Sequence, residues 1–145
     1  MAGISVDNRV ATGSELKLAK FWFGLAFIGL LALGVVSLIP APDLGGNDKI
    51  GHFIAYALLS TWFSLLVEQR KSLWRILFGL IAYGLLLEFL QGLTSYRSGD
   101  LADAVANSLG VTTGLAFYFS PLRRILRKVD RWLLARILHK GGDNL

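Results

Sequence analysis

The stretch Leu87–Gly110, LEFLQGLTSYRSGDLADAVANSLG, decides how the rest of the chain is interpreted. It begins and ends inside apolar runs. Between them lie four ionisable and two amide side chains: Glu88, Gln91, Arg97, Asp100, Asp103 and Asn107. Several of them are three or four residues apart, so they share one face of a helix. In a chain of 145 residues that is 54% hydrophobic and 17% charged, this concentration of polar groups needs a specific explanation.

The apolar residues gather in four long segments rather than at amphipathic intervals. These segments are 21–39, 50–67, 73–93 and 101–119, and each is close to the about 20 residues that cross the hydrocarbon core of a membrane. We therefore predict an all-α integral membrane protein with a four-helix transmembrane bundle. We expect an N-terminal segment at 1–20, the four-span domain at 21–119 and a C-terminal tail at 120–145.

Basic residues are distributed unevenly around these segments. Twelve of the fifteen Lys and Arg residues precede the first segment, lie between the second and third, or follow the fourth, and Arg75 lies at the adjoining edge of the third. The positive-inside rule makes that side cytoplasmic, so both termini are expected in the cytoplasm. The net charge of +5 is then a topology signal, and no nucleic-acid partner is predicted.

The tail that follows Pro121 has the pattern of a basic amphipathic helix. Leu126, Val129 and Leu133 recur at helical spacing. The other face is predicted to carry the charged residues Arg123, Arg124, Arg127, Lys128, Asp130 and Arg131. A helix of this kind is expected to lie along the anionic inner leaflet of the membrane.

Under this topology, polar side chains from three helices lie at one level of the outer leaflet. At about 1.5 Å per residue, all of the following lie within about 9 Å of the outer end of their helix: His52, Tyr56, Glu88, Gln91, Asp103 and Asn107. Ionisable side chains inside a membrane are costly and usually face the bundle interior or a wet cavity. We therefore predict a polar, ligand-binding pocket that opens outward and is ringed by Asp48, Lys49, Arg97 and Asp100.

Simpler roles stay open for single members of this set. His52 and Tyr56 could lie among lipid headgroups, and Asp100 is a good N-cap for the fourth helix. Glu88 needs a partner or a proton at its depth, and Arg97 is the expected partner.

The order and spacing of these residues resemble the signature of the VanZ-like family of small membrane proteins, which is named for a teicoplanin (glycopeptide) resistance protein. The match consists of DKIGHFIAY at 48–56, EFLQ at 88–91 and YRSGDLADAVANSLGVTTG at 96–114. The resemblance implies a multi-pass, four-helix domain in the bacterial cytoplasmic membrane, and it brings no settled activity. In the last segment, the spacing of Gly110 and Gly114 favours close helix packing.

Two functions fit this pattern. A binding module would hold the headgroup of an envelope lipid or of a lipid-linked cell-wall or glycan precursor, with Lys49 and Arg97 meeting phosphate. A role in cell-envelope homeostasis or glycopeptide resistance would follow from such a ligand. The alternative is a membrane-embedded hydrolase or group transferase acting on the same lipid, with His52 as the base and Glu88 or Asp103 as the orienting carboxylate.

The sequence indicates no cofactor requirement for either function. The chain has no cysteine, which excludes thiolate metal sites, and no metal site is predicted. The alternative left open is an oxygen-ligated divalent cation, Mg²⁺, Mn²⁺ or Ca²⁺, among the four carboxylates Asp48, Glu88, Asp100 and Asp103.

Overall fold

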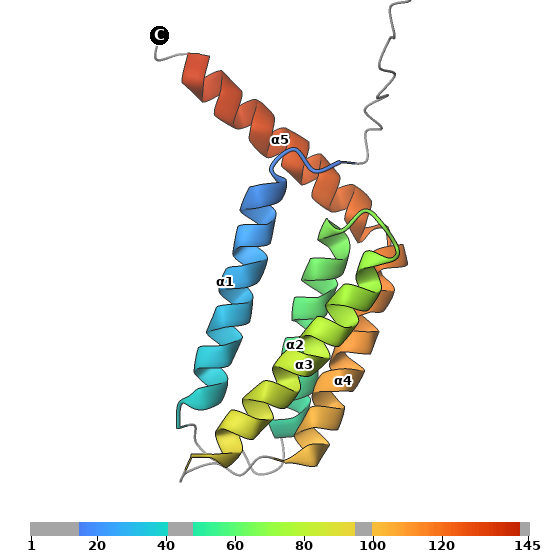
Figure 1. Cartoon of the computed structure of the whole chain (residues 1–145). Helices are drawn as coiled ribbons and strands as arrows, with labels where there is room; N and C mark the ends of the chain where they lie inside the picture. The colour runs from blue at the N-terminus through green and yellow to red at the C-terminus, as the bar shows by residue number, and fades with distance from the viewer. Residues whose placement is uncertain (1–14, 41–47, 95–99, 143–145) are drawn as a thin grey trace, which may run out of the picture.

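The computed structural model is all-helical over the residues that it describes, which are 15–40, 48–94 and 100–142. The elements, in chain order, are α1 Ala19–Leu38, α2 Asp48–Leu66, α3 Ser72–Gly92, α4 Leu101–Leu115, the short 3-10 helix η1 Ala116–Phe119, and α5 Leu122–Gly142 (Figure 1). The all-α prediction is confirmed. The first four helices, with η1 completing the fourth, begin and end within two residues of the predicted segments.

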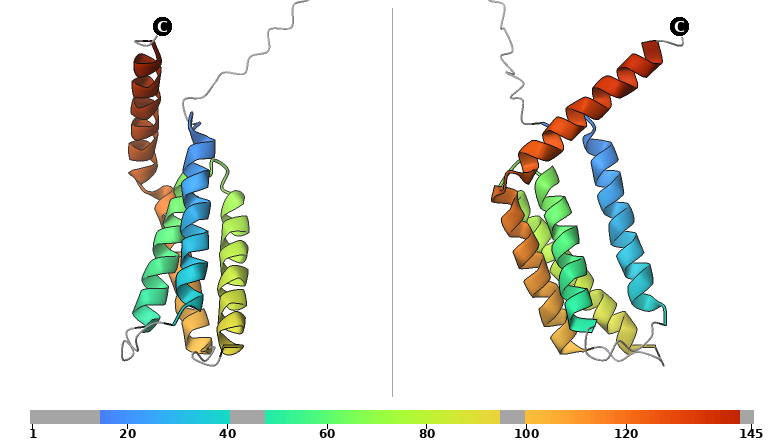
Figure 2. Two further views of the ribbon diagram at one scale, coloured as in Figure 1. Left: turned by 90° about the vertical axis from the view of Figure 1, so that its left-hand side faces the viewer. Right: turned by 180° about the vertical axis from the view of Figure 1, so that it is seen from behind.

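Helices α2, α3 and α4 form the packed part of the bundle, α1 stands beside them, and α5 crosses one end at an angle (Figures 1 and 2). The end where α2 and α4 begin and α1 and α3 finish holds Asp48, His52, Glu88 and Asp103, and we call it the polar end. We call the opposite end, which α5 crosses, the basic end. The topology thus brings side chains from three helices to one place.

Two glycines let α2 and α4 pack more extensively than any other pair of described helices. A side-chain carbon at Gly114 would overlap Ser60 Oγ and the carbonyl oxygen of Ala57, and one at Gly110 would overlap the carbonyl oxygen of Phe53. Only a residue without a side chain permits this approach of two backbones. The close-packing prediction for this pair of glycines is confirmed.

Helix α1 is held to its neighbours by hydrogen bonds to its own backbone. Side chains of α2 and α3 donate to carbonyl oxygens at three levels of α1: Trp62 Nε1 to Trp22 (3.3 Å), Tyr83 Oη to Leu30 (2.9 Å) and Gln91 Nε2 to Ser37 (2.8 Å). Ser37 lies in the last turn of α1, where carbonyl groups lack partners within the helix. Gln91 therefore also caps the C-terminal end of α1.

The N-terminal end of α1 is capped by α5. Asp130 is only 1% exposed, and its carboxylate accepts from the backbone N–H groups of Lys17 (2.6 Å) and Leu18 (2.9 Å) and from the indole N–H of Trp22 (2.8 Å). No side chain of its own caps α1 there. The prediction that Asp130 lies on the polar face of the tail helix is therefore wrong, because three donors at the positive end of α1 draw it inward.

The electrostatics of this contact favour the charged carboxylate. Burial alone would raise the pKa of Asp130. The two backbone N–H groups and the indole N–H outweigh it, so that the pKa lies below its ordinary value. Asp130 therefore binds α1 in its ionised form at neutral pH.

Among the described helices, α1 and α3 are long and apolar enough to cross a membrane. Helix α4 has 15 residues, and α2 carries Asp48, Lys49 and His52 in its first turns. Length and composition thus support the predicted membrane spans at α1 and α3. They do not by themselves confirm the predicted spans at α2 and α4.

Candidate functional site

The polar end brings seven of the predicted site residues into one connected cluster. Helix α2 supplies Asp48, Lys49 and His52, α3 supplies Glu88, and Asp100, Asp103 and Asn107 come from the start of α4. Lys49 and Asp100 are about half exposed, whereas Glu88 and Asn107 are buried. The cluster therefore runs from a charged, exposed rim to a buried polar floor.

A chain of hydrogen bonds links the three helices across this floor. Asn107 Nδ2 donates to Glu88 Oε1 (3.4 Å), so that Asn107 Oδ1 faces His52 Nδ1 at 3.1 Å. A carbonyl oxygen can only accept, so the hydrogen-bond network assigns the proton of the ring to Nδ1. In neutral His52, Nε2 is then a free lone pair.

Glu88 has two hydrogen-bond partners among the described residues, one of which is Asn107. Its second carboxylate oxygen accepts from the backbone N–H of Asp100 (3.2 Å). An amide and a backbone N–H thus satisfy this buried carboxylate among the described residues. The predicted partner, Arg97, lies outside the described residues.

Lys49 connects the two helix starts at the rim. Its Nζ lies 2.7 Å from Asp100 Oδ2 and 3.3 Å from Asp103 Oδ1. The hydrogen bond to Asp100, followed by that to Asp103, raises the pKa of Lys49, and the same hydrogen bond from Lys49 lowers the pKa of Asp100. Asp100 also accepts from the backbone N–H of Ala102 (2.8 Å), which confirms its predicted role as the N-cap of α4.

The other nitrogen of His52 faces two carboxylates. Nε2 lies 3.7 Å from Asp48 Oδ1 and 3.9 Å from Asp103 Oδ2. These separations are too long for hydrogen bonds. One ligand atom from each of the three residues lies within 4.8 Å of the other two, which is a spacing that a single cation can bridge.

Two predicted site residues lie beside this cluster rather than in it. Gln91 donates to α1, as described above. Tyr56 is 1% exposed, and its hydroxyl has no hydrogen-bond partner among the described residues. Gly84 makes room for it, since a side-chain carbon there would lie 3.2 Å from the Tyr56 hydroxyl. Their ligand-binding roles stay predictions.

The unpartnered hydroxyl of Tyr56 leads to a stability prediction. Tyr56→Phe is expected to leave thermal stability in detergent unchanged or to raise it by about 1 kcal/mol, because it removes a buried polar group that gains nothing from folding. Tyr83→Phe is the matched control. It loses the hydrogen bond to Leu30 and should cost about 1 kcal/mol. Equal losses in both variants would mean that the Tyr56 hydroxyl has a partner after all.

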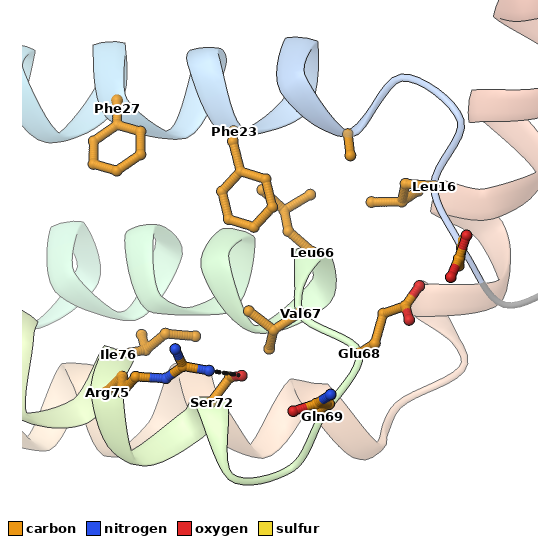
Figure 3. A pocket seen from close by; sticks show the side chains of 12 residues that line it. Leu16, Phe23, Phe27, Leu66, Val67, Glu68, Gln69, Ser72, Arg75 and Ile76 are labelled. Carbon is orange, nitrogen blue, oxygen red and sulfur yellow. Dashed lines mark hydrogen bonds between the residues drawn. The ribbon is translucent and has the colours of Figure 1, made fainter.

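Two cavities between the described helices were not predicted from the sequence. One of about 790 Å³ lies at the basic end between α1, α2 and α3, where Phe23 and Phe27 point towards Leu66, Val67 and Ile76 (Figure 3). The other, of about 450 Å³, lies between α1 and α2 and is lined by Leu25, Ala26, Gly29, Leu33, Ala55, Leu58, Leu59 and Trp62. Side-chain periodicity identifies the faces that meet but not the space left between them.

The protein is thus a helical bundle with a buried polar cluster at the starts of α2 and α4. The chain belongs to the VanZ/LLP1 family, whose model matches residues 8–126, and the predicted resemblance is confirmed. An uncharacterized protein of the fission yeast Schizosaccharomyces pombe is 35% identical over 100 residues, which cover 67% of this chain and 60% of that relative. No solved structure matches the chain.

Proposed function

We propose that this chain is a four-span membrane protein of the bacterial cytoplasmic membrane, with both termini in the cytoplasm. At its polar end it binds the headgroup of an envelope lipid or of a lipid-linked cell-wall precursor. One observation carries the proposal: the polarity of α2, α3 and α4 is reversed relative to helices of a protein in water. Membership of the VanZ/LLP1 family is consistent with it.

The reversed polarity is found on all three helices. Their exposed surface includes Leu58, Phe78 and Leu109, each more than half exposed, whereas Ser60 and Asn107 are almost completely buried. A helix in water buries its apolar face and exposes its polar one. The opposite arrangement suits hydrocarbon on the outside and polar groups inside, which supports treating α2 and α4 as spans together with α1 and α3.

The arrangement of the polar end suits an amphipathic ligand. Lys49 at the rim offers an ammonium to a phosphate oxygen, and His52 and Asp103 behind it offer hydrogen-bond partners to a sugar or an amine. The apolar cavity between α1 and α2 reaches Ala55, which is about 4.5 Å along α2 from His52. An acyl or prenyl chain could enter there while its headgroup stays at the polar end.

The tail helix supports the same orientation. Ile125, Trp132 and Ile137 are each more than half exposed, and basic residues surround them in the sequence. Such a helix at the basic end suits contact with the anionic inner leaflet.

A membrane-embedded hydrolase or group transferase is the second candidate, and the state of His52 favours it. In the neutral ring the hydrogen bond to Asn107 places the proton on Nδ1, so Nε2 faces Asp48 and Asp103 as a lone pair, which is the form that a general base requires. A lipid that His52→Gln binds but no longer turns over would distinguish this function from binding alone.

Native mass spectrometry of gently extracted protein tests the binding proposal. Wild type is expected to retain a discrete lipid, and Glu88→Gln to retain at least about tenfold less. An amide at this position turns its NH2 group towards either Asn107 Nδ2 or the Asp100 N–H, so one of these two donors loses its acceptor and the network that holds His52 is disturbed. Glu68→Gln, which changes an exposed carboxylate at the basic end, is the matched control. The same unselective lipid in all three proteins would contradict the proposal.

A second pair of variants tests the chain of the lipid separately. A side-chain carbon at Gly29 would lie 3.6 Å from Leu59 Cδ1, whereas one at Gly24 has nothing within 4 Å. Gly29→Leu therefore fills the cavity between α1 and α2, and Gly24→Leu adds the same bulk to an open surface. Loss of lipid from the first variant alone would assign the chain to this cavity.

A further inference from the structure

We propose that Asp48, His52 and Asp103 bind one zinc ion at the polar end. This inference goes beyond lipid binding and does not depend on it, because the ligands come from the protein alone. The site would add a metal centre to a cluster for which the sequence predicts none.

Two helix starts supply the three ligands. Asp48 and His52 are separated by four residues in the first turns of α2, so they lie on one face. Asp103 lies in the first turn of α4, and α2 and α4 begin side by side at the same end (Figures 1 and 2). The contacts of Gly110 and Gly114 with α2 fix the distance between these two backbones. The ligand set is therefore positioned by the best-packed pair of helices.

The convergence of lone pairs points to a cation. In neutral His52 the proton on Nδ1 leaves Nε2 as a lone pair, and Nε2 faces one carboxylate oxygen of Asp48 and one of Asp103. A protonated ring would draw a carboxylate to about 2.8 Å. The observed 3.7 Å and 3.9 Å instead suit two ligands that are each about 2.1 Å from a shared metal ion.

Neighbouring residues orient two of the three ligands, His52 and Asp103. Asn107 accepts the Nδ1 proton of His52 and is itself held by Glu88, an outer-shell arrangement that metal-binding histidines usually have. Lys49 binds Oδ1 of Asp103, so that Oδ2 is the oxygen turned towards His52. Tautomer, ring orientation and carboxylate orientation are all set by hydrogen bonds.

The donor set selects the metal. One imidazole nitrogen and two carboxylate oxygens make three protein ligands, which is the number in zinc sites that keep a fourth position open. Zinc also binds nitrogen-containing sites more tightly than Mn²⁺ or Fe²⁺ does. The imidazole therefore favours zinc over the Mg²⁺, Mn²⁺ or Ca²⁺ that the carboxylates alone suggested. The open position would take water or a phosphate oxygen.

Zinc titration of the chelator-stripped, lipid-free full-length protein in detergent tests the site. Wild type is expected to bind one Zn²⁺ in competition with a chromophoric chelator, and the zinc X-ray absorption spectrum should show imidazole scattering. His52→Gln should weaken binding by more than the about 10- to 100-fold that outer-shell changes cost. His139→Gln removes the only other histidine of the chain and is the matched control.

Asp48→Asn keeps the test valid if His52→Gln fails to fold, because Asp48 is at the start of α2 with its side chain about half exposed. It should weaken zinc binding at least tenfold. Three results would each overturn the proposal: no stoichiometric zinc on wild type, wild-type affinity in Asp48→Asn, or equal losses in His52→Gln and His139→Gln. Since no lipid is present, these results are independent of the lipid-binding experiment.

Discussion

Gly114→Ala is expected to lower the free energy of unfolding by about 3 kcal/mol, a large effect for the addition of one methyl group. The new carbon would overlap Ser60 Oγ and the carbonyl oxygen of Ala57 and would lie 2.8 Å from the backbone nitrogen of Thr61. Rotation of Ser60 can relieve only the first of these contacts. The other two are with the backbone, so α2 and α4 have to separate, and the polar end loses its geometry as they do.

Gly79→Ala is the matched control for this variant. Gly79 lies in α3 with nothing within 4 Å of an added carbon, so alanine should raise stability by up to about 1 kcal/mol through helix propensity. Thermal unfolding in detergent measures both variants, and opposite signs are expected. A Gly114→Ala variant as stable as Gly79→Ala would show that α2 and α4 do not pack as described.

Asp130→Ala is expected to release α5 from the bundle at a cost of about 3–5 kcal/mol. It leaves the N–H groups of Lys17 and Leu18 and the indole of Trp22 without their acceptor, and each such loss costs about 1–3 kcal/mol in a buried position. Hydrogen exchange should show loss of protection at the amides of Lys17 and Leu18 and throughout α5. Arg131→Ala, on the exposed side of the same turn, should leave protection unchanged.

The same contact predicts a pH dependence. The pKa of Asp130 is lowered in the folded protein, so its contribution to stability is complete above the unfolded pKa of about 3.9 and is lost as the pH falls through the folded value. Protection factors at Lys17 and Leu18 should therefore be constant from about pH 8 to 5 and fall only below about pH 4. A decrease near neutral pH would assign the docking to another group.

The helices were predictable because their determinants are local. Long apolar runs set their number and length, the spacing of Gly110 and Gly114 predicted close packing, and Asp100 was recognisable as an N-cap. The common level of the polar residues also followed from counting along helices. These features could be predicted because each depends on residues within one helix or on the number of residues between helix ends.

The partners of the polar groups were harder to predict because they depend on contacts between helices. Charge complementarity suggested a cation as the partner of Glu88, and it did not predict the hydrogen bonds from Asn107 and the Asp100 N–H. Gln91 shares a face with Glu88 but reaches α1. For Asp130 a signal did exist: it follows the buried Leu126 by four residues and precedes the half-buried Leu133 by three, so it lies on their face rather than with the arginines.

The way in which α1 is held has a consequence for how the chain can diverge. Tyr83 and Gln91 bind carbonyl oxygens of α1, and a carbonyl oxygen is present whatever residue carries it. Leu30 and Ser37 can therefore be exchanged for other helix-forming residues while both hydrogen bonds persist, whereas Tyr83 and Gln91 have few substitutes. At these two positions sequence drift can accumulate in α1 without moving it, because Tyr83 and Gln91 recognise its main chain and not its side chains.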